Sequence, residues 1–189
     1  GADTRVIIPG YGFLDHEDYN ISHLFTFDLT LHEGTATIRV YTTIQDGVPF
    51  YFIQAWPYFG NDDPVYTDWD YDVPRFIFFN QVVMAVAWQL SQRLNWFPDV
   101  FHVNDWHTSL VPFLLSDSHW KEEWSFVASV STIHNIGYQG NGVGGFLWDA
   151  GIATRNHPLL HRYNLVDNLL AIGIVYADMV NTVSPTYAT

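Results

Sequence analysis

After residue 74, apolar segments of helix length alternate along the chain with shorter apolar segments of strand length. This alternation limits the possible folds more than any other feature of the sequence. Residues 74–94 form a long apolar segment that predicts a buried helix with Pro74 in its first turn. Ser184 and Pro185 predict the start of another helix near the end of the chain. Strands that alternate with helices predict an α/β fold with a doubly wound parallel sheet. The elements expected between these points are strand 100–103, helix 108–115, strand 125–133, helix 164–177 and strand 179–183.

The first third of the chain follows a different pattern. Residues 5–9 predict a short buried strand that ends at a Pro-Gly turn. Three further strands are expected at 23–31, 35–44 and 49–53, because glycine turn signals separate them. These three strands predict an antiparallel β-meander inserted in the fold. Residues 61–72 are polar and aromatic and predict a loop.

Polar side chains follow two of the predicted strands at their C-terminal ends. Asp105 and His107 come directly after the first strand, and His134 and Asn135 come after the second. The carboxyl ends of strands in open α/β sheets form ligand sites, so we expect one shared site here. Two structural alternatives stay open: Asp105 caps the next helix, and His134 and Asn135 occupy an ordinary turn.

Three weaker patterns are better explained without a cofactor. His102, Asp105 and His107 match a metal triad, but strand alternation points the first two to opposite faces. The glycines of 140–145 match a dinucleotide loop, but they do not directly follow a strand. The acidic segment 68–72 lacks the glycine and distal glutamate of an EF-hand and predicts a solvated loop. We therefore expect neither a metal nor a cofactor.

The charge balance and the cysteine count exclude several functions. The chain has 189 residues, with 7 Lys+Arg against 20 Asp+Glu, for a net charge of −13. This acidity argues against a nucleic-acid-binding surface. Lys121 is the only lysine of the chain, so few cations are available to bind a phosphate group. Cysteine is absent, which excludes disulfides and fits a reducing compartment. No segment predicts a membrane span or a signal peptide.

Three strings in this order are similar to motifs of a known family. The chain resembles the glycogen and starch synthases, which are retaining glycosyltransferases of family 5 with the GT-B fold. The strings are Asp105-Trp106-His107, the I-H-N-x-x-Y-Q-G segment 133–140, and one longer string, Y-A-D…V-S-P-T-Y-A, within 176–188.

The resemblance implies a fold, a reaction and a set of site residues. The fold would be a Rossmann-like lobe, one of the two that enclose a GT-B cleft. The reaction would transfer glucose from ADP-glucose, or from UDP-glucose, to the non-reducing end of an α-1,4-glucan. The implied catalytic residues are His134 and Asp105, and the implied substrate-binding residues are Trp106, His107, Asn135, Tyr66, Asn164 and Gln139.

The chain also departs from the family pattern. The family's lysine-and-diglycine loop, with its strand and helix, is expected before Arg5, and its C-terminal lobe is expected after Thr189. The usual lysine ahead of Gly173 is replaced by Ala171. We therefore expect residues 1–189 to be an incomplete N-terminal catalytic domain that is inactive alone. Its compartment would be the bacterial cytoplasm or the plastid.

Two other functions remain open at this point. One is a non-catalytic glucan-binding module, because Tyr66 and Trp69 could stack on sugar rings. The other is a GT-B transferase that uses a different nucleotide sugar.

Overall fold

The computed structural model describes residues 1–153 and 155–184. The predicted helix start at Pro185 therefore lies outside the described residues. The chain divides into two compact units, the first of residues Gly1–Asp72 and the second beginning at Val73. Among the described residues, no helix combines the length and the apolar character needed to cross a bilayer.

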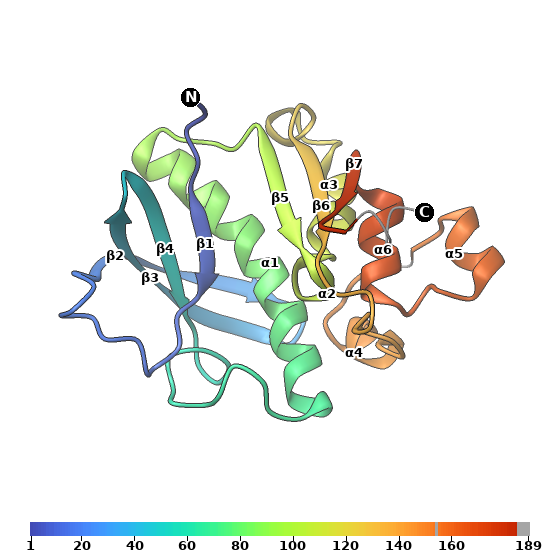
Figure 1. Cartoon of the computed structure of the whole chain (residues 1–189), viewed down its shortest axis with the longest axis horizontal. Coiled ribbons are helices and arrows are strands. Elements are labelled where there is room, and N and C mark those ends of the chain that lie inside the picture. Colours follow the sequence, from blue (N-terminus) through green and yellow to red (C-terminus); the bar gives the residue numbers. More distant parts are fainter. Residues whose placement is uncertain (154, 185–189) are drawn as a thin grey trace. The chain divides into compact units, whose positions relative to one another are not determined.

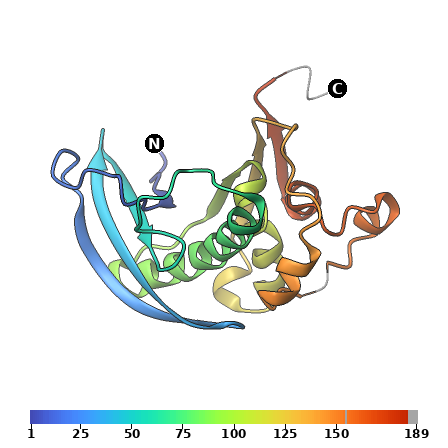
Figure 2. The same cartoon turned by 90° about the horizontal axis from the view of Figure 1, so that it is seen from below.

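The first unit contains a four-stranded sheet in the order β1-β4-β3-β2 (Figure 1). The predicted meander is confirmed, because β2 pairs with β3 and β3 with β4 in antiparallel register. The first strand, β1, pairs in parallel with β4. Figure 2 shows the long β2–β3 hairpin curving along its length. The strands are β1 (Val6–Pro9), β2 (Ser22–Leu31), β3 (Gly34–Gln45) and β4 (Val48–Gln54).

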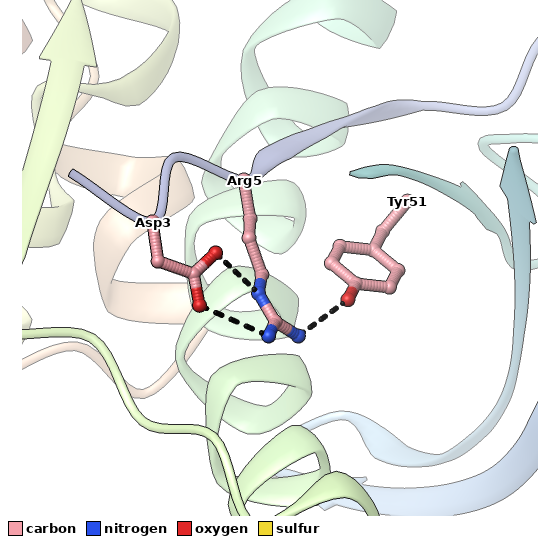
Figure 3. A network of polar contacts seen from close by, with 3 residues as sticks. All are labelled: Asp3, Arg5 and Tyr51. Carbon is pink, nitrogen blue, oxygen red and sulfur yellow. Dashed lines mark hydrogen bonds and ion pairs between the residues drawn. The ribbon is translucent and has the colours of Figure 1, made fainter. Parts of the chain in front are cut away.

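A polar network fastens the start of β1 to β4 (Figure 3). The Arg5 guanidinium donates to the Tyr51 hydroxyl at 2.9 Å and forms an ion pair with Asp3 at 3.2 Å. Burial lowers the pKa of Arg5, but the hydrogen bonds with Asp3 and Tyr51 outweigh it and leave the pKa raised. The Tyr51 side chain is buried in the core of the unit, so its hydroxyl needs this partner.

Helix α1 (Trp69–Leu94) begins five residues before the predicted start at Pro74, so the predicted loop 61–72 is too long. The reason is a helix cap: Asp68 Oδ1 accepts the Tyr71 N–H at 3.0 Å. The Asp72 carboxylate also reaches back and accepts the Thr67 N–H at 3.0 Å, which ties the residue before the cap to the first turn. Aspartates at 68–72 therefore begin a helix and do not form a solvated loop.

The second unit contains a parallel sheet in the order β5-β6-β7, and this confirms the predicted parallel sheet of an α/β fold. Its strands are β5 (Val100–Asn104), β6 (Ala128–Ile133) and β7 (Met179–Thr182). Its further helices are α2 (Asp105–Thr108), α3 (Val111–Ser118), η1 (Glu122–Trp124), α4 (Gly144–Asp149), α5 (Pro158–Tyr163) and α6 (Leu169–Tyr176).

Three of the predicted boundaries in this unit are wrong. The predicted helix 108–115 is two helices, α2 and α3, and Pro112 in the first turn of α3 fits a new helix start. The predicted strand 125–133 is shorter, because η1 and a turn precede β6. The predicted helix 164–177 begins only at Leu169, where the Asn168 side chain accepts the Ala171 N–H at 2.8 Å.

The helices of the second unit share one apolar core. Its members come from these helices, from the loops beside them and from Ile133 of β6, and they include Phe76, Trp106, Leu147 and Leu170. Helix α6 approaches α2 so closely at Gly173 that a Cβ there would lie 2.7 Å from the Ser109 Cβ. Only glycine allows this packing, which holds α6 beside the end of β5.

Candidate functional site

Asp105 joins the carboxyl ends of β5 and β6. It follows β5 directly and has a left-handed backbone, with φ of 53°. Its Oδ1 accepts the backbone N–H groups of His134 and Asn135, with N···O distances of 2.7 and 3.0 Å. The predicted helix-capping role is therefore not what this side chain does. The carboxylate instead fixes the turn that begins where β6 ends.

His134 is exposed at this turn and is oriented by its neighbour on β5. Its Nε2 lies 2.9 Å from Asn104 Oδ1. Because an amide oxygen only accepts, Nε2 is the donor in this hydrogen bond. The Asn135 side chain accepts the Gly137 N–H at 2.9 Å and so shapes the next turn. Both strand ends thus present polar groups on one rigid edge.

Trp106 and His107 lie behind this edge and are packed together. Their ring centroids are 4.2 Å apart, and Phe76 packs edge-on against both. Trp106 is buried and His107 is half-buried. These two predicted binding residues therefore form the wall behind the turn, and their rings are less accessible than the ring of His134.

The buried side-chain amide of Asn80 fixes the backbone that carries Trp106 and His107. The Asn80 side chain donates to the carbonyls of Phe76 and His107, at 2.6 and 2.7 Å. Its oxygen accepts the N–H groups of Leu110 and Val111, at 3.1 and 3.0 Å. Asn80 is 1% exposed, and three of these bonds are buried while the bond to His107 is partly buried. It holds the junction of α2 and α3 against α1.

Gln139 links the glycine-rich loop to the start of α6. Its Oε1 accepts from the Asn168 amide at 2.8 Å, and its carbonyl accepts the Leu170 N–H at 2.9 Å. The Gly140 carbonyl accepts the Leu169 N–H at 2.9 Å. The first amides of α6 are thus occupied by this loop. A Cβ at Gly140 would also lie 2.9 Å from Leu169.

Arg155 supports the segment that precedes α6. Its guanidinium donates to the Val166 carbonyl and to Asp167 Oδ1, both at 3.2 Å. Burial lowers the pKa of Arg155, and the Asp167 carboxylate opposes that effect. This cation is therefore held inside the unit and has a structural role in the loop.

The structure brings together only some of the predicted site residues. Asp105, His134 and Asn135 meet directly, whereas Asn164 is exposed and ends α5 in a left-handed conformation. Tyr66 is exposed on the first unit. Both residues stay predictions. The residues that the sequence analysis missed as site components are Asn104, Asn80 and Asn168.

The metal triad considered from the sequence does not form a cluster. His102 Nε2 lies 2.6 Å from Thr132 Oγ1, so its ring is engaged across β5 and β6. Over the described ranges, no three His, Cys, Asp or Glu side chains gather in a way that could hold a metal ion.

Comparisons with known proteins all point to one family. Residues 1–189 match the family described as starch synthase catalytic domain. The chain is 36% identical to a glycogen synthase of Streptococcus uberis and 37% identical to one of Streptococcus agalactiae. Each alignment covers 100% of this chain and 39% of the relative.

The fold also matches a solved structure. This is the catalytic domain of starch synthase IV from Arabidopsis thaliana, bound to ADP and acarbose. The TM-score is 0.78 at 22% identity, over 97% of this chain and 38% of the other. The likeness supports the predicted α/β fold of a GT-B lobe.

Proposed function

Because this chain belongs to the starch synthase catalytic domain family, we propose that it forms one lobe of a glucosyltransferase. The reaction moves a glucosyl group from ADP-glucose to the non-reducing end of an α-1,4-glucan, with release of ADP. UDP-glucose is the alternative donor. The observation that carries the proposal is the Asp105 bridge, which holds exposed His134 at the joined ends of β5 and β6.

The site residues take distinct roles in this proposal. His134 contacts the donor sugar through Nδ1, because Nε2 is already engaged with Asn104 Oδ1. Asp105 is a positioning residue, because its Oδ1 acts through the His134–Asn135 backbone. Asn135 and Gln139 supply amide groups for further hydroxyls. Trp106 and His107 form the wall that keeps the turn in position.

Such a site accelerates transfer by holding the reactants and stabilising charge. The leaving diphosphate and the acceptor hydroxyl would meet one face of the anomeric carbon. The chain contributes few cations for the diphosphate, with 7 Lys+Arg in all. We propose that a C-terminal lobe supplies these contacts, since the chain spans 39% of the length of the relatives it matches.

The proposal also fixes expectations about the isolated chain and its compartment. The 189-residue chain alone should not elongate a glucan, because its 7 Lys+Arg are few and we assign the diphosphate contacts to a C-terminal lobe. The compartment would be the bacterial cytoplasm or the plastid. The absence of cysteine fits either reducing environment.

An elongation assay tests the function directly. The full-length protein that carries this chain is incubated with a maltooligosaccharide primer and either ADP-glucose or UDP-glucose. We expect longer α-1,4-glucans with α-anomeric linkages by NMR, and faster growth with ADP-glucose. Absence of elongation with both donors would refute the proposal. Measurable elongation by the 189-residue chain alone would refute the need for a second lobe.

A further inference from the structure

A cavity of about 460 Å³ lies in the second unit, between one face of α1 and the segment around η1. Met84, Ala85 and Trp88 line it from α1, because residues three and four positions apart share a face of a helix. Lys121 and Trp124 line it from the segment around η1. Sites for small molecules have volumes of about 300–1,000 Å³, so this cavity is large enough for a ligand.

The two tryptophans of the cavity are held in place by packing. The Phe97 ring packs edge-on against both, with its centroid 6.4 Å from that of Trp88 and 4.7 Å from that of Trp124. Trp124 also stacks on Phe101 at 6.3 Å. Aromatic rings that are already fixed lose little conformational freedom when a ligand packs against them. This part of the cavity therefore suits a flat apolar group.

Two opposite charges line the same cavity. Lys121 is the only lysine of the chain, and Glu123 follows it two positions later. Both side chains are exposed, and neither forms an ion pair with another described residue. The Lys121 ammonium instead lies 5.0 Å from the centroid of the Trp120 ring. Both charges are thus available to a ligand.

These charges limit the chemical class of the ligand. A phosphorylated compound needs several cations, but the cavity has one, which Glu123 opposes in a chain of net charge −13. A neutral sugar offers neither charge an opposite partner. A zwitterion supplies a carboxylate for Lys121 and an ammonium for Glu123. An α-amino acid with an aromatic side chain also covers the apolar wall of the cavity.

We propose that this cavity binds a free aromatic α-amino acid. The ligand's carboxylate pairs with the Lys121 ammonium, and its ammonium pairs with the Glu123 carboxylate. Its ring packs against Trp88 and Trp124. The cavity includes none of the residues at the edge that carries His134, so this binding does not depend on the proposed transferase function.

An NMR titration with L-phenylalanine tests the site in the full-length protein that carries this chain, without nucleotide sugar or glucan. Two analogues separate the charges, because phenylpropionate lacks the ammonium and phenylethylamine lacks the carboxylate. We expect a Kd of about 0.1–1 mM for L-phenylalanine, as for a small ligand in an open cavity. Each analogue should bind about threefold to fivefold more weakly, the effect of one exposed ion pair. Equal affinities for all three compounds would overturn the proposal.

Substitutions on both sides of the cavity locate the ligand. Met84→Trp should weaken L-phenylalanine binding about tenfold or more, because its indole fills the cavity. Glu123→Gln should bind L-phenylalanine no more tightly than phenylpropionate, because the partner of the ligand's ammonium is gone. Lys121→Met should likewise remove the preference for L-phenylalanine over phenylethylamine. Glu122→Gln is the matched control, since Glu122 is an adjacent exposed carboxylate outside the cavity, and it should keep the wild-type affinity.

The same titrations contain the results that would overturn the proposal. Failure of L-phenylalanine to bind the wild-type protein is one of them. Equal losses in Glu122→Gln and Glu123→Gln are another, because binding would then reflect surface charge in general. Binding of a maltooligosaccharide in place of L-phenylalanine, with loss of that binding in Met84→Trp, would identify a sugar site and would also overturn it.

Discussion

Replacing Asp105 by alanine should remove the bridge between β5 and β6. The two charged hydrogen bonds to His134 and Asn135 contribute about 1.5 kcal/mol each, the lower value for bonds to charged groups. Alanine at a φ of 53° adds about 1 kcal/mol of backbone strain. Together these effects should lower the free energy of unfolding by about 4 kcal/mol. For a chain of this size, that loss lowers Tm by about 8–16 °C.

Two other substitutions of Asp105 distinguish the contribution of the hydrogen bonds from that of the backbone strain. Asp105→Asn keeps an acceptor oxygen and tolerates the left-handed backbone, so it should lose only about 1 kcal/mol. Asp105→Gly relieves the strain but keeps neither bond, so it should lose about 3 kcal/mol. The predicted order of stability is therefore wild type, asparagine, glycine and alanine.

Urea unfolding followed by circular dichroism measures these differences, and amide hydrogen exchange localises them. The His134 and Asn135 amides should lose protection in Asp105→Ala while the amides in the middle of β6 keep theirs. Equal stability of the alanine and asparagine variants would refute the reasoning. So would unchanged protection of the two amides in Asp105→Ala.

Three further substitutions test the frame around the site by the same unfolding measurement. Asn80→Leu should lower the free energy of unfolding by between about 2 and 4 kcal/mol, because it leaves buried backbone groups unpaired. A decrease below about 1 kcal/mol would contradict the four hydrogen bonds assigned to Asn80. Gly173→Ala should lower the free energy of unfolding by about 1–3 kcal/mol, because its Cβ would clash with Ser109. Gly145→Ala is the control, since a Cβ there meets open space, and it should leave the stability unchanged or raise it. Tyr51→Phe should cost about 1 kcal/mol through the lost Arg5 bond, and equal stability would show that this bond exchanges freely for water.

The strands were largely predictable because their signals are local. Apolar runs bounded by glycine turns located β2, β3 and β4 within a few residues. The pairing of β1 with β4 was not predictable, since parallel partners are chosen by contacts distant in sequence. The early start of α1 had a local signal in Asp68, whose capping role was masked by its acidic and aromatic surroundings.

The break between α2 and α3 shows why some features escape a sequence pattern. The break is fixed by a contact distant in sequence, because the side chain of Asn80, 30 residues away, accepts the Leu110 N–H there. Pro112 was the one local signal that could have located the new helix.

The candidate site was predictable in outline from topology alone. Polar residues after two adjacent parallel strands had to meet at one edge of the sheet. Asp105 adopts a left-handed backbone conformation and accepts a hydrogen bond from the His134 amide, which is 29 residues away. No local sequence pattern could have predicted this contact. The pairing of His134 with Asn104 is of the same kind, because it crosses 30 residues.

The turnover of a His134→Ala variant tests the central claim most directly. The measurement is kcat for glucan elongation from ADP-glucose by the full-length protein, with His119→Ala as a control at another exposed histidine. We predict that kcat falls about 100-fold or more in His134→Ala, while His119→Ala keeps the wild-type value and both variants keep the wild-type Tm. A His134→Ala variant that elongates glucan at the wild-type rate would contradict the account.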